Sequence, residues 1–381
     1  MTQLETLIQT LCPNGVHWSS VNDLIKQKIV YTVSASIKLK RNDYLTEGAT
    51  PIISQEEEFI SGYTNVTDKN ITEREYVCFG DHSEHIKYVD FAFVQGADGL
   101  KIMYCNQDAL SAKYFYYAVS NFYKKHCNYE RHFKYLQELQ IPLPPLAVQS
   151  EIVRILDKFT LYKSELAAEL AARLQQYEYY RDQLLTFDDT VKRVKLGEVG
   201  KMQYGYPFNA SLFTDEKNDK PIIRIRDVVP AHANTYYNGN VDDLENYIIR
   251  RGDMLVGMDG YFNMAKWNDD NAYLNQRVCK ISTANSKVVL DGFLFHFLKP
   301  TFKIIEQNTA GGSVIHLSAK VINNILIPLP PLSEQERIVS ILDRFDKLCH
   351  DIREGLPAEI DLRQKQYEHY RDKLLTFEAK G

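Results

Sequence analysis

At 381 residues the chain is long enough for two or three domains, since a domain commonly holds about 150 residues. Hydrophobic residues make up 44% and charged residues 25%, an ordinary globular balance that allows each domain to bury a core. The formal net charge of −5 excludes a chain that is basic throughout. Any attraction to nucleic acid must therefore come from local basic surfaces or from a partner.

The sequence shows no signs of a membrane or secreted protein. It contains no run of about 18 apolar residues, so no transmembrane helix is predicted. The opening residues, MTQLETLIQTLCPNGVHW, lack the basic start and apolar run of a signal peptide. Six scattered cysteines have no CxxC spacing, which argues against a zinc ribbon and favours reduced thiols. We therefore expect a cytoplasmic protein.

Two stretches of the chain, residues 1–140 and 188–326, have the pattern of small mixed domains. Strand-like runs at 76–81, 91–94, 221–226 and 253–256 are separated by Gly, Asn and Asp, and short helices are expected at 109–124 and 290–306. The two stretches share little sequence beyond a faint echo between Val16–Leu24 and Val191–Val199. This pattern predicts two diverged α+β domains.

A long internal repeat follows each of these domains. Residues 141–159 read IPLPPLAVQSEIVRILDKF, and residues 327–345 read IPLPPLSEQERIVSILDRF, at an offset of 186. Further on, QYEYYRDQLLTF at 176–187 matches QYEHYRDKLLTF at 366–377, at an offset of 190. Solenoid repeats are only about 20 to 50 residues long, so this spacing indicates duplicated domains.

The start of each repeat predicts an extended segment that leads into a helix. The prolines of IPLPPL exclude a central strand or a helix, because proline lacks the amide donor and fixes φ. In the second copy, Ser333 precedes Glu336 by three residues and resembles a capping box. Ser150 of the first copy is less well placed for that role.

Both repeats carry one apolar stripe at helical spacing. In the first copy the stripe comprises Ile152, Leu156, Phe159, Leu166, Leu170, Leu174, Tyr177 and Leu184; in the second it comprises Ile338, Leu342, Phe345, Ile352, Leu356, Tyr367, Tyr370 and Leu374. A helix from Ala147 to Phe187 would be roughly 60 Å long and needs a partner helix, for which the other copy is suited. Gly355-Leu356-Pro357 should divide the second helix into two pieces, with Pro357 in a first turn near Glu359.

These motifs resemble the specificity subunit of a type I restriction-modification system. The resemblance spans essentially the whole chain and includes the phrases at 79–102 and 222–260, although the repeats are the more specific part. It implies target-recognition domains at 1–146 and 188–332, a central helical region at 147–187 and a C-terminal helical region at 333–377. The implied fold is α+β, with two globular domains separated by two long antiparallel, coiled-coil-like helical regions in a pseudo-two-fold repeat.

The same resemblance implies a function. Each domain would read one half of a split, asymmetric double-stranded DNA site, and the helices would fix the unread spacer. Two methyltransferase subunits would dock for adenine methylation, and two motor-nuclease subunits would join for restriction. The chain itself would have no catalytic residue and no cofactor, since S-adenosylmethionine, ATP and Mg²⁺ would be bound by partner subunits.

A four-residue unit is written twice at 164–171, as Ser-Glu-Leu-Ala-Ala-Glu-Leu-Ala. One more unit would lengthen a helix by about 6 Å. Because DNA rises about 3.4 Å per base pair, we predict a spacer that is one or two base pairs longer. The alternative is a plain low-complexity helical segment.

Candidate DNA contacts are basic and aromatic residues in expected loops, which could bind phosphates or base edges. In the first domain they are Lys38, Lys40, Arg41, His82, His85, Lys87, Tyr129, Arg131, His132 and Lys134; in the second they are Tyr204, Tyr206, Arg224, Arg226, Lys266 and Arg277. For each of them an ordinary solvated side chain is the alternative.

Motifs for chemistry are missing from the sequence. There is no GxxxxGK[ST] loop and no Asn-Pro-Pro-aromatic tetrapeptide of an amino-methyltransferase. Asp253, Asp259 and Lys266 are residue types that could form a nuclease site, but charged residues are common in loops, so we do not predict one. Metal binding near His82 and His85 is conceivable, but a polar turn is favoured, and we predict no metal ligand. The alternative functions are a protein-interaction scaffold with a helical spacer and, disfavoured by the missing motifs, a stand-alone nuclease or methyltransferase.

Overall fold

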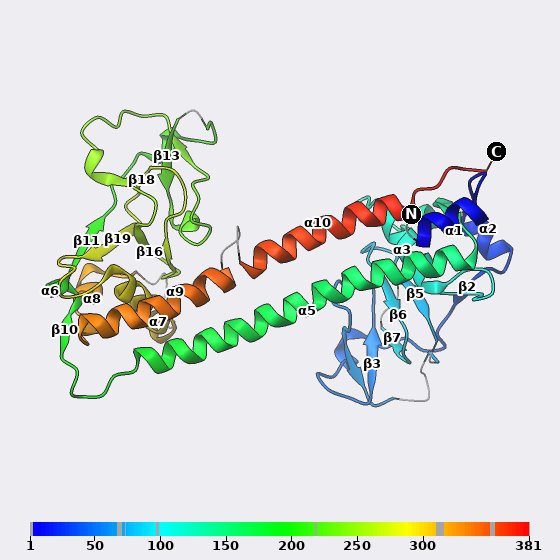
Figure 1. Ribbon diagram of the computed structural model, residues 1–381, viewed down its shortest axis with the longest axis horizontal. Helices are drawn as coiled ribbons and strands as arrows, with labels where there is room; N and C mark the ends of the chain where they lie inside the picture. The colour runs from blue at the N-terminus through cyan, green and yellow to red at the C-terminus, as the bar shows by residue number, and fades with distance from the viewer. Residues whose placement is uncertain are drawn as a thin grey trace. The chain divides into compact units, whose positions relative to one another are not determined.

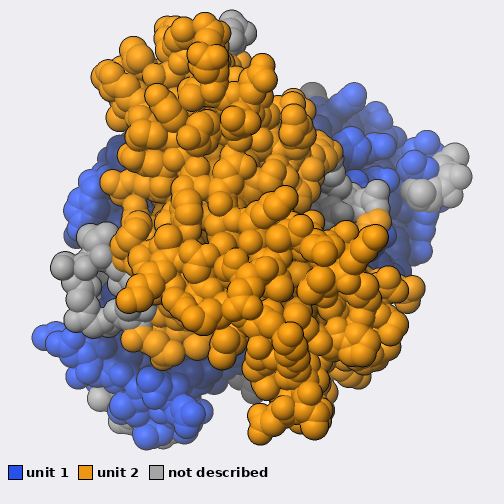
Figure 2. Space-filling model, turned by 90° about the vertical axis from the view of Figure 1, so that its left-hand side faces the viewer, with its two compact units in different colours: residues 1–168, 359–381 blue, residues 169–358 orange. Residues whose placement is uncertain are grey.

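The computed structural model describes residues 3–66, 71–72, 74–96, 99–217, 219–309, 316–350 and 355–380. The chain divides into two compact units: unit 1 with residues 1–168 and 359–381, and unit 2 with residues 169–358. They are coloured blue and orange in Figure 2. Among the described residues, no helix is long and apolar enough to cross a membrane. The boundaries of the four segments expected from the sequence stay a prediction.

The globular part of unit 1 mixes short strands and helices. Its described strands are β1 (His17–Ser20), β2 (Val30–Val33), β3 (Thr50–Ile53), β4 (Gly62–Thr64), β5 (Tyr76–Gly80), β6 (Ile86–Val89), β7 (Val94–Gln95), β8 (Leu100–Cys105) and β9 (Gln140–Leu143). Its described helices are α1 (Gln3–Leu11), α2 (Val21–Lys26), the 3₁₀ turn η1 (Arg41–Asp43), α3 (Ala112–Phe122) and α4 (Phe133–Glu138). The strands form sheets in the orders β2-β8-β5-β6, β4-β3-β7 and β1-β9, and only β3 and β7 run parallel among these described pairs.

Strand β5 shows where the core of unit 1 lies. All five of its residues are buried. Side chains alternate between the two faces of a strand, and here Val77 and Phe79 enter one apolar cluster while Tyr76 and Cys78 enter another. Helix α3 covers the first face with Tyr114, and the three-stranded sheet covers the second. A four-stranded sheet with both faces covered gives the turn after β5 a rigid base.

The globular part of unit 2 has the same kind of elements. Its described strands are β10 (Arg193–Lys195), β11 (Gly200–Tyr204), β12 (Phe213–Thr214), β13 (Lys220–Ile223), β14 (Tyr236–Tyr237), β15 (Ile248–Ile249), β16 (Met254–Gly257), β17 (Met264–Lys266), β18 (Ala272–Leu274), β19 (Val278–Thr283) and β20 (Leu326–Pro328). Its described helices are α6 (Leu196–Val199), α7 (Asp291–Thr309), α8 (Ala319–Asn323) and the 3₁₀ turns η2 (Ala210–Leu212), η3 (Ile225–Asp227) and η4 (Glu245–Tyr247). The sheets are β11-β19-β16-β17, β12-β14-β13-β18-β15 and β10-β20.

The two globular parts share one topology although their sequences have diverged. The order β11-β19-β16-β17 repeats β2-β8-β5-β6, and the parallel pair of β13 and β18 repeats that of β3 and β7. Ser19 pairs with Ile141 in β1-β9, and Val194 pairs with Ile327 in β10-β20. Ser19 and Val194 are aligned positions in the faint sequence echo, so the echo marks equivalent strands. The α+β class is confirmed.

Of the local predictions, one strand is partly correct, two helices are confirmed and one capping box is wrong. The expected strand at 91–94 is reduced to β7, and Phe93 pairs with Ile71 in an isolated bridge. The expected helices at 109–124 and 290–306 are confirmed as α3 and α7. The capping box at Ser333 is wrong, because α9 (Leu332–His350) begins one residue earlier and Pro331 O accepts its first backbone hydrogen bonds.

The repeated helices have the predicted asymmetry. Helix α5 (Leu146–Leu185), green in Figure 1, is continuous over 40 residues, whereas the second copy forms α9 and α10 (Leu356–Leu375). Pro357 and Glu359 lie in the first turn of α10 as expected, and residues 351–354 lie outside the described part. In unit 1, Phe159 of α5 stacks on Tyr370 and Lys163 bonds to Gln364, so α5 and α10 run antiparallel there. In unit 2, Tyr180 stacks on Phe345 of α9.

A buried glutamine joins each globular part to its helix. The Gln149 side chain accepts a hydrogen bond from Ser111 N (2.9 Å) and donates to the carbonyls of Ala109 (3.3 Å) and Pro144 (2.8 Å). The Gln335 side chain makes the matching bonds: it accepts from Leu290 N (3.0 Å) and donates to the carbonyls of Val288 (3.1 Å) and Pro330 (3.0 Å). Both side chains are almost fully buried. Each glutamine therefore ties the IPLPP turn to the start of α3 or α7, and we call this arrangement the glutamine joint.

Candidate nucleic-acid interface

Each unit presents a short turn at the same place in its four-stranded sheet. In unit 1 the turn 81–85 connects β5 to β6, and in unit 2 the turn 258–263 connects β16 to β17. Each turn accepts a backbone hydrogen bond from the segment that precedes a short helix. His132 N, before α4, donates to Asp81 O, and Leu317 N, before α8, donates to Met258 O, both at 2.7 Å. We call the turn 81–85 with loop 123–132 the unit 1 tip, and the turn 258–263 with Arg277 and His316 the unit 2 tip.

The unit 1 tip carries an exposed aromatic stack. The rings of His82 and Tyr129 lie 5.2 Å apart at an interplanar angle of 15°, and Tyr129 is 91% exposed. His82 Nδ1 lies 2.9 Å from Glu130 O, which fixes the ring against the loop. Arg131, two residues after Tyr129, is also exposed. A flat π surface beside a guanidinium group suits contact with bases and phosphates.

Two lysines, Lys125 and Lys134, lie in loop 123–132 and just after it. His85 Nδ1 lies 3.4 Å from Lys125 Nζ. Partial burial, followed by the Lys125 charge, lowers the pKa of His85, so the imidazole is neutral at physiological pH and can both donate and accept a hydrogen bond. Lys134 pairs with Glu130 at 2.8 Å and lies over the Tyr135 ring. This pairing orders Lys134 but neutralises part of its charge.

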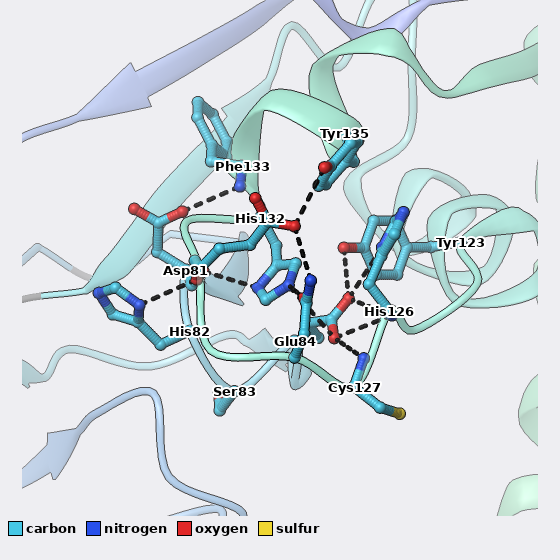
Figure 3. Close-up of polar contacts among 12 residues, drawn as sticks. Asp81, His82, Ser83, Glu84, Tyr123, His126, Cys127, His132, Phe133 and Tyr135 are labelled. Atoms are coloured by element: carbon cyan, nitrogen blue, oxygen red, sulfur yellow. Dashed lines mark hydrogen bonds and ion pairs between the residues drawn. The ribbon is translucent and has the colours of Figure 1, made fainter.

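A buried carboxylate holds the loop of the unit 1 tip in place (Figure 3). Glu84 accepts hydrogen bonds from the backbone of His126 and Cys127 and from the Tyr123 hydroxyl (2.7 Å). Burial alone would raise the pKa of Glu84, but these bonds outweigh it and lower the pKa to about 2. His132 is fully buried beside this carboxylate. The hydrogen bonds to Glu84 therefore fix the loop that carries Tyr129 and Arg131 to the turn between β5 and β6.

The unit 2 tip is built from different residues. Asp259 binds Arg277 at 3.4 Å and His316 at 2.6 Å, and the Arg277 and His316 side chains are 62% and 58% exposed. Gly260 has φ of +72°, a conformation that glycine adopts without strain, and the next residue, Tyr261, is 70% exposed. Tyr261 and His316 were missed by the sequence prediction. A tyrosine after glycine in a polar turn is the one signal that could have found Tyr261.

Four predicted contacts of unit 1 that are not buried lie in its tip, namely His82, His85, Tyr129 and Arg131, and Lys134 follows the tip in α4. Lys38, Lys40 and Arg41 lie in and before η1 and are exposed. Arg41 pairs with Glu56 at 3.2 Å, and the neighbouring Gln55 side chain accepts a hydrogen bond from His82 N. These contacts connect the segment 38–41 to the tip.

Three predicted contacts are not available to DNA. Lys87 is 6% exposed, and its Nζ donates to the backbone carbonyls of Ser54 and Glu58. His132 has no exposed surface, and its Nδ1 lies 3.1 Å from Asp81 O. The Tyr204 hydroxyl is buried and packs toward the core of unit 2. Burial removes each of these polar groups from solvent, so their assignment as DNA contacts is wrong.

The remaining predicted contacts of unit 2 are only partly at its tip. Arg277 belongs to the tip. Lys266 pairs with Asp343 of α9 at 3.3 Å and lies over the Phe295 ring, so it links the sheet to the helix. Tyr206 packs in an aromatic cluster, and Arg224 lies over the Phe213 ring. Arg226 donates to Thr235 Oγ1 at 2.8 Å and remains 57% exposed.

The suggested nuclease residues are not assembled. Asp253 pairs with Lys280, Asp259 with Arg277, and Lys266 with Asp343. Each group has its own partner in a different contact. Among the described residues, then, these side chains do not form the single site that an acid-base reaction needs.

Two copies of one α+β topology, each with an exposed aromatic and cationic tip and each tied to a long helix, define a two-domain nucleic-acid recognition protein. The sequence comparison gives its family. Residues 22–176 and 188–362 each match the family described as type I restriction modification DNA specificity domain. The chain is also 31% identical over 404 residues to the EcoR124I/EcoR124II specificity subunit of Escherichia coli, over 99% of this chain and 98% of that one. The chain belongs to this family and is a type I restriction-modification specificity subunit.

Other relatives support the same assignment. A putative type I restriction enzyme specificity subunit of Haemophilus influenzae is 35% identical over 255 residues, 64% of this chain and 65% of that protein. Among solved structures, the S subunit from M. genitalium superposes with a TM-score of 0.61 at 15% identity, over 95% of this chain and 96% of that one. A chain from a study of type I system assembly gives a TM-score of 0.53 at 14% identity, over 95% and 98% of the two chains. The structural matches show the fold.

Proposed function

We propose that the two tips read the two halves of one asymmetric DNA sequence and that the helical regions set the unread spacer between them. The observation that carries the proposal is the duplication of the tip: the same turn of the same sheet occurs in both units, with different side chains. Two domains with the same fold but different side chains at their tips would recognise different half-site sequences. The family match to a DNA specificity domain also occurs twice, once over the globular part of each unit.

The tips supply both kinds of DNA contact. Arg131 and Arg277 can donate paired hydrogen bonds to a guanine edge or bind phosphate, while the Tyr129 ring offers a stacking surface. The net charge of −5 opposes DNA, so binding by the isolated chain is weak and improves when partners add basic surface. A protein-interaction scaffold without DNA binding is disfavoured, because it does not account for two matches to a DNA specificity domain.

The chemistry belongs to partner subunits in this proposal. Two methyltransferase subunits dock on the repeated helices for adenine methylation, and two motor-nuclease subunits complete the restriction complex in the cytoplasm. The helices expose large apolar side chains that would suit such docking, including Leu161, Tyr162, Tyr179 and Leu362. S-adenosylmethionine, ATP and Mg²⁺ are bound by those partners, and this chain acts by placing them on DNA.

The decisive experiment is methylation mapping of a genome that expresses this chain with its methyltransferase partner. A single split motif with two unlike halves and a constant spacer is expected. Purification of the pair should give a complex that shifts DNA containing this motif and not a scrambled duplex. A complex without sequence preference would overturn the proposal, and failure to form a complex with the methyltransferase would overturn its docking role.

Replacing one arginine at each tip should weaken binding to a different half-site. We expect Arg131→Ala and Arg277→Ala each to weaken binding of the methyltransferase complex by about 10-fold to 100-fold, the effect of losing about 1–3 kcal/mol of base contact. Band shifts with duplexes altered in one half-site measure this, because a variant becomes insensitive to changes in the half that it no longer reads. The matched control is Lys26→Ala, an exposed cation on α2 outside the tip. Equal loss in all three variants would contradict the assignment.

A further inference from the structure

Three potential metal ligands meet beneath the exposed stack of the unit 1 tip. The side chains of Glu84, His126 and His132 each offer one ligand atom, and these atoms lie within 4.8 Å of one another. Glu84 comes from the turn between β5 and β6, and both histidines come from loop 123–132, so the group joins two segments far apart in sequence (Figure 3). Within the described part of the chain it is the one such group of three that meets this criterion.

The separations between these atoms are long for hydrogen bonds to a carboxylate and are close to those between ligands of a shared cation. His126 Nδ1 lies 3.3 Å from Glu84 Oε2, and His132 Nε2 lies 3.7 Å from Glu84 Oε1. Hydrogen bonds between a charged nitrogen donor and a carboxylate oxygen are shorter, at about 2.7–2.9 Å. Ligands around a tetrahedral Zn²⁺ ion, at bond lengths of about 2.0–2.2 Å, lie roughly 3.3–3.6 Å apart. The separations of 3.3 Å and 3.7 Å are close to that range.

The surroundings prepare the ligands for a metal. His132 Nδ1 lies 3.1 Å from Asp81 O and Nε2 lies 2.7 Å from Asn128 Oδ1, so a metal at Nε2 would replace the hydrogen bond to Asn128 while Nδ1–H keeps its bond to Asp81 O. A metal-bound histidine typically donates its other N–H to a carbonyl or carboxylate in this way. Glu84 is 3% exposed, and the backbone N–H groups of His126 and Cys127 hydrogen-bond to its carboxylate and fix its orientation. The His126 ring is held by stacking on Tyr135 at 4.0 Å.

We propose that Glu84, His126 and His132 bind one Zn²⁺-class ion that locks loop 123–132 onto the turn 81–85. Two imidazole nitrogens and one carboxylate oxygen favour Zn²⁺ over Mg²⁺ or Ca²⁺, which take mainly oxygen ligands. Asn128 Oδ1 now lies 2.7 Å from His132 Nε2, so on metal binding it moves outward and either joins as the fourth ligand or yields that position to water. The ion has a structural role: it fixes the loop that presents Tyr129 and Arg131.

The site is tested on the full-length chain without an added histidine tag. After chelator treatment, titration with Co²⁺ should show one equivalent with the visible absorption of tetrahedral coordination, and Zn²⁺ should displace it. The key variant is His126→Ala, which removes one ligand but keeps the backbone N–H bonds to Glu84. Since loss of an outer partner alone costs about 10-fold to 100-fold in metal affinity, loss of this ligand should weaken Zn²⁺ binding by roughly 100-fold or more.

His85→Ala is the matched control, because His85 lies in the same turn but outside the group of three ligands. It should bind one equivalent with unchanged affinity, and His126→Cys, which restores a ligand, should recover binding. Zn²⁺ should also raise the thermal unfolding midpoint of the parent chain and not that of His126→Ala. Absence of stoichiometric binding, or equal binding by His126→Ala and the parent, would overturn the proposal and leave a hydrogen-bonded loop anchor. Neither outcome depends on DNA recognition.

Discussion

With one extra Ala-Ala-Glu-Leu unit after Leu170, this chain should direct its methyltransferase partner away from the original DNA site and to one with a longer spacer. Four residues add about 6 Å and rotate a helix about 40° beyond a full turn. DNA rises about 3.4 Å and turns about 35° per base pair, so the added length favours two base pairs and the added rotation favours one. Both half-sites should stay unchanged while the spacer grows by one or two base pairs.

The position of the repeated unit supports this expectation. The division between the two compact units falls at residues 168 and 169, inside the repeat 164–171 of α5. The side chains of this stretch are exposed or half-buried, so an insertion there leaves the core of each unit intact. Methylation mapping of the insertion strain measures the spacer. A matched control, Ala168→Glu, changes the sequence but not the length of the helix and should keep the original site. An unchanged spacer in the insertion strain would refute the idea that helix length sets the spacer.

Replacing the buried glutamine of a joint should strongly destabilise the unit that contains it. Gln335→Met keeps the volume of the side chain but leaves Leu290 N and the carbonyls of Val288 and Pro330 without their partner. Unsatisfied buried groups cost about 1–3 kcal/mol each, and with partial relaxation we expect a total loss of about 3 kcal/mol in unfolding free energy. Gln149→Met should have the same effect in unit 1, because its three bonds match.

Urea unfolding and hydrogen exchange measure this loss. The amide of Leu290 should lose protection in Gln335→Met and keep it in Gln149→Met, and the amide of Ser111 should behave in the opposite way. Gln175→Ala, an exposed glutamine of α5, is the control and should change stability by less than about 0.5 kcal/mol. If Gln335→Met unfolds at the same urea concentration as the parent, the glutamine joint does not contribute to the free energy of unfolding.

Several features of the protein follow from the sequence alone. The prolines of IPLPPL, the helical spacing of the apolar stripe and the Gly-Leu-Pro break are local signals, and they correctly predicted the extended segment, α5 and the divided α9 and α10. The duplication itself is read directly from matching residues at 141–159 and 327–345. These predictions hold because each depends on neighbours along the chain.

Tertiary structure decided which polar residues are available at the tips. Nothing in the sequence distinguishes Lys87 from Lys134. In the fold, Lys87 is buried and donates to a backbone carbonyl, whereas the Lys134 side chain is exposed. In the sequence, Glu84 is an ordinary polar residue and His132 is a candidate DNA contact, but pairing between distant segments buries them together. Burial depends on contacts made across dozens of residues, which no local pattern records.

The repeat could be found in the sequence only in part. The helices kept their sequence because they share one packing role, whereas the globular domains kept only their topology and lost nearly all matching residues. The faint echo at Val16–Leu24 was visible, but the common order β2-β8-β5-β6 and β11-β19-β16-β17 was not. A sheet specifies which faces are apolar and which strands are neighbours, and many different side chains satisfy that requirement. The sequence therefore determined the duplicated helices, and only the fold showed that the two tips occupy equivalent positions in two copies of one topology.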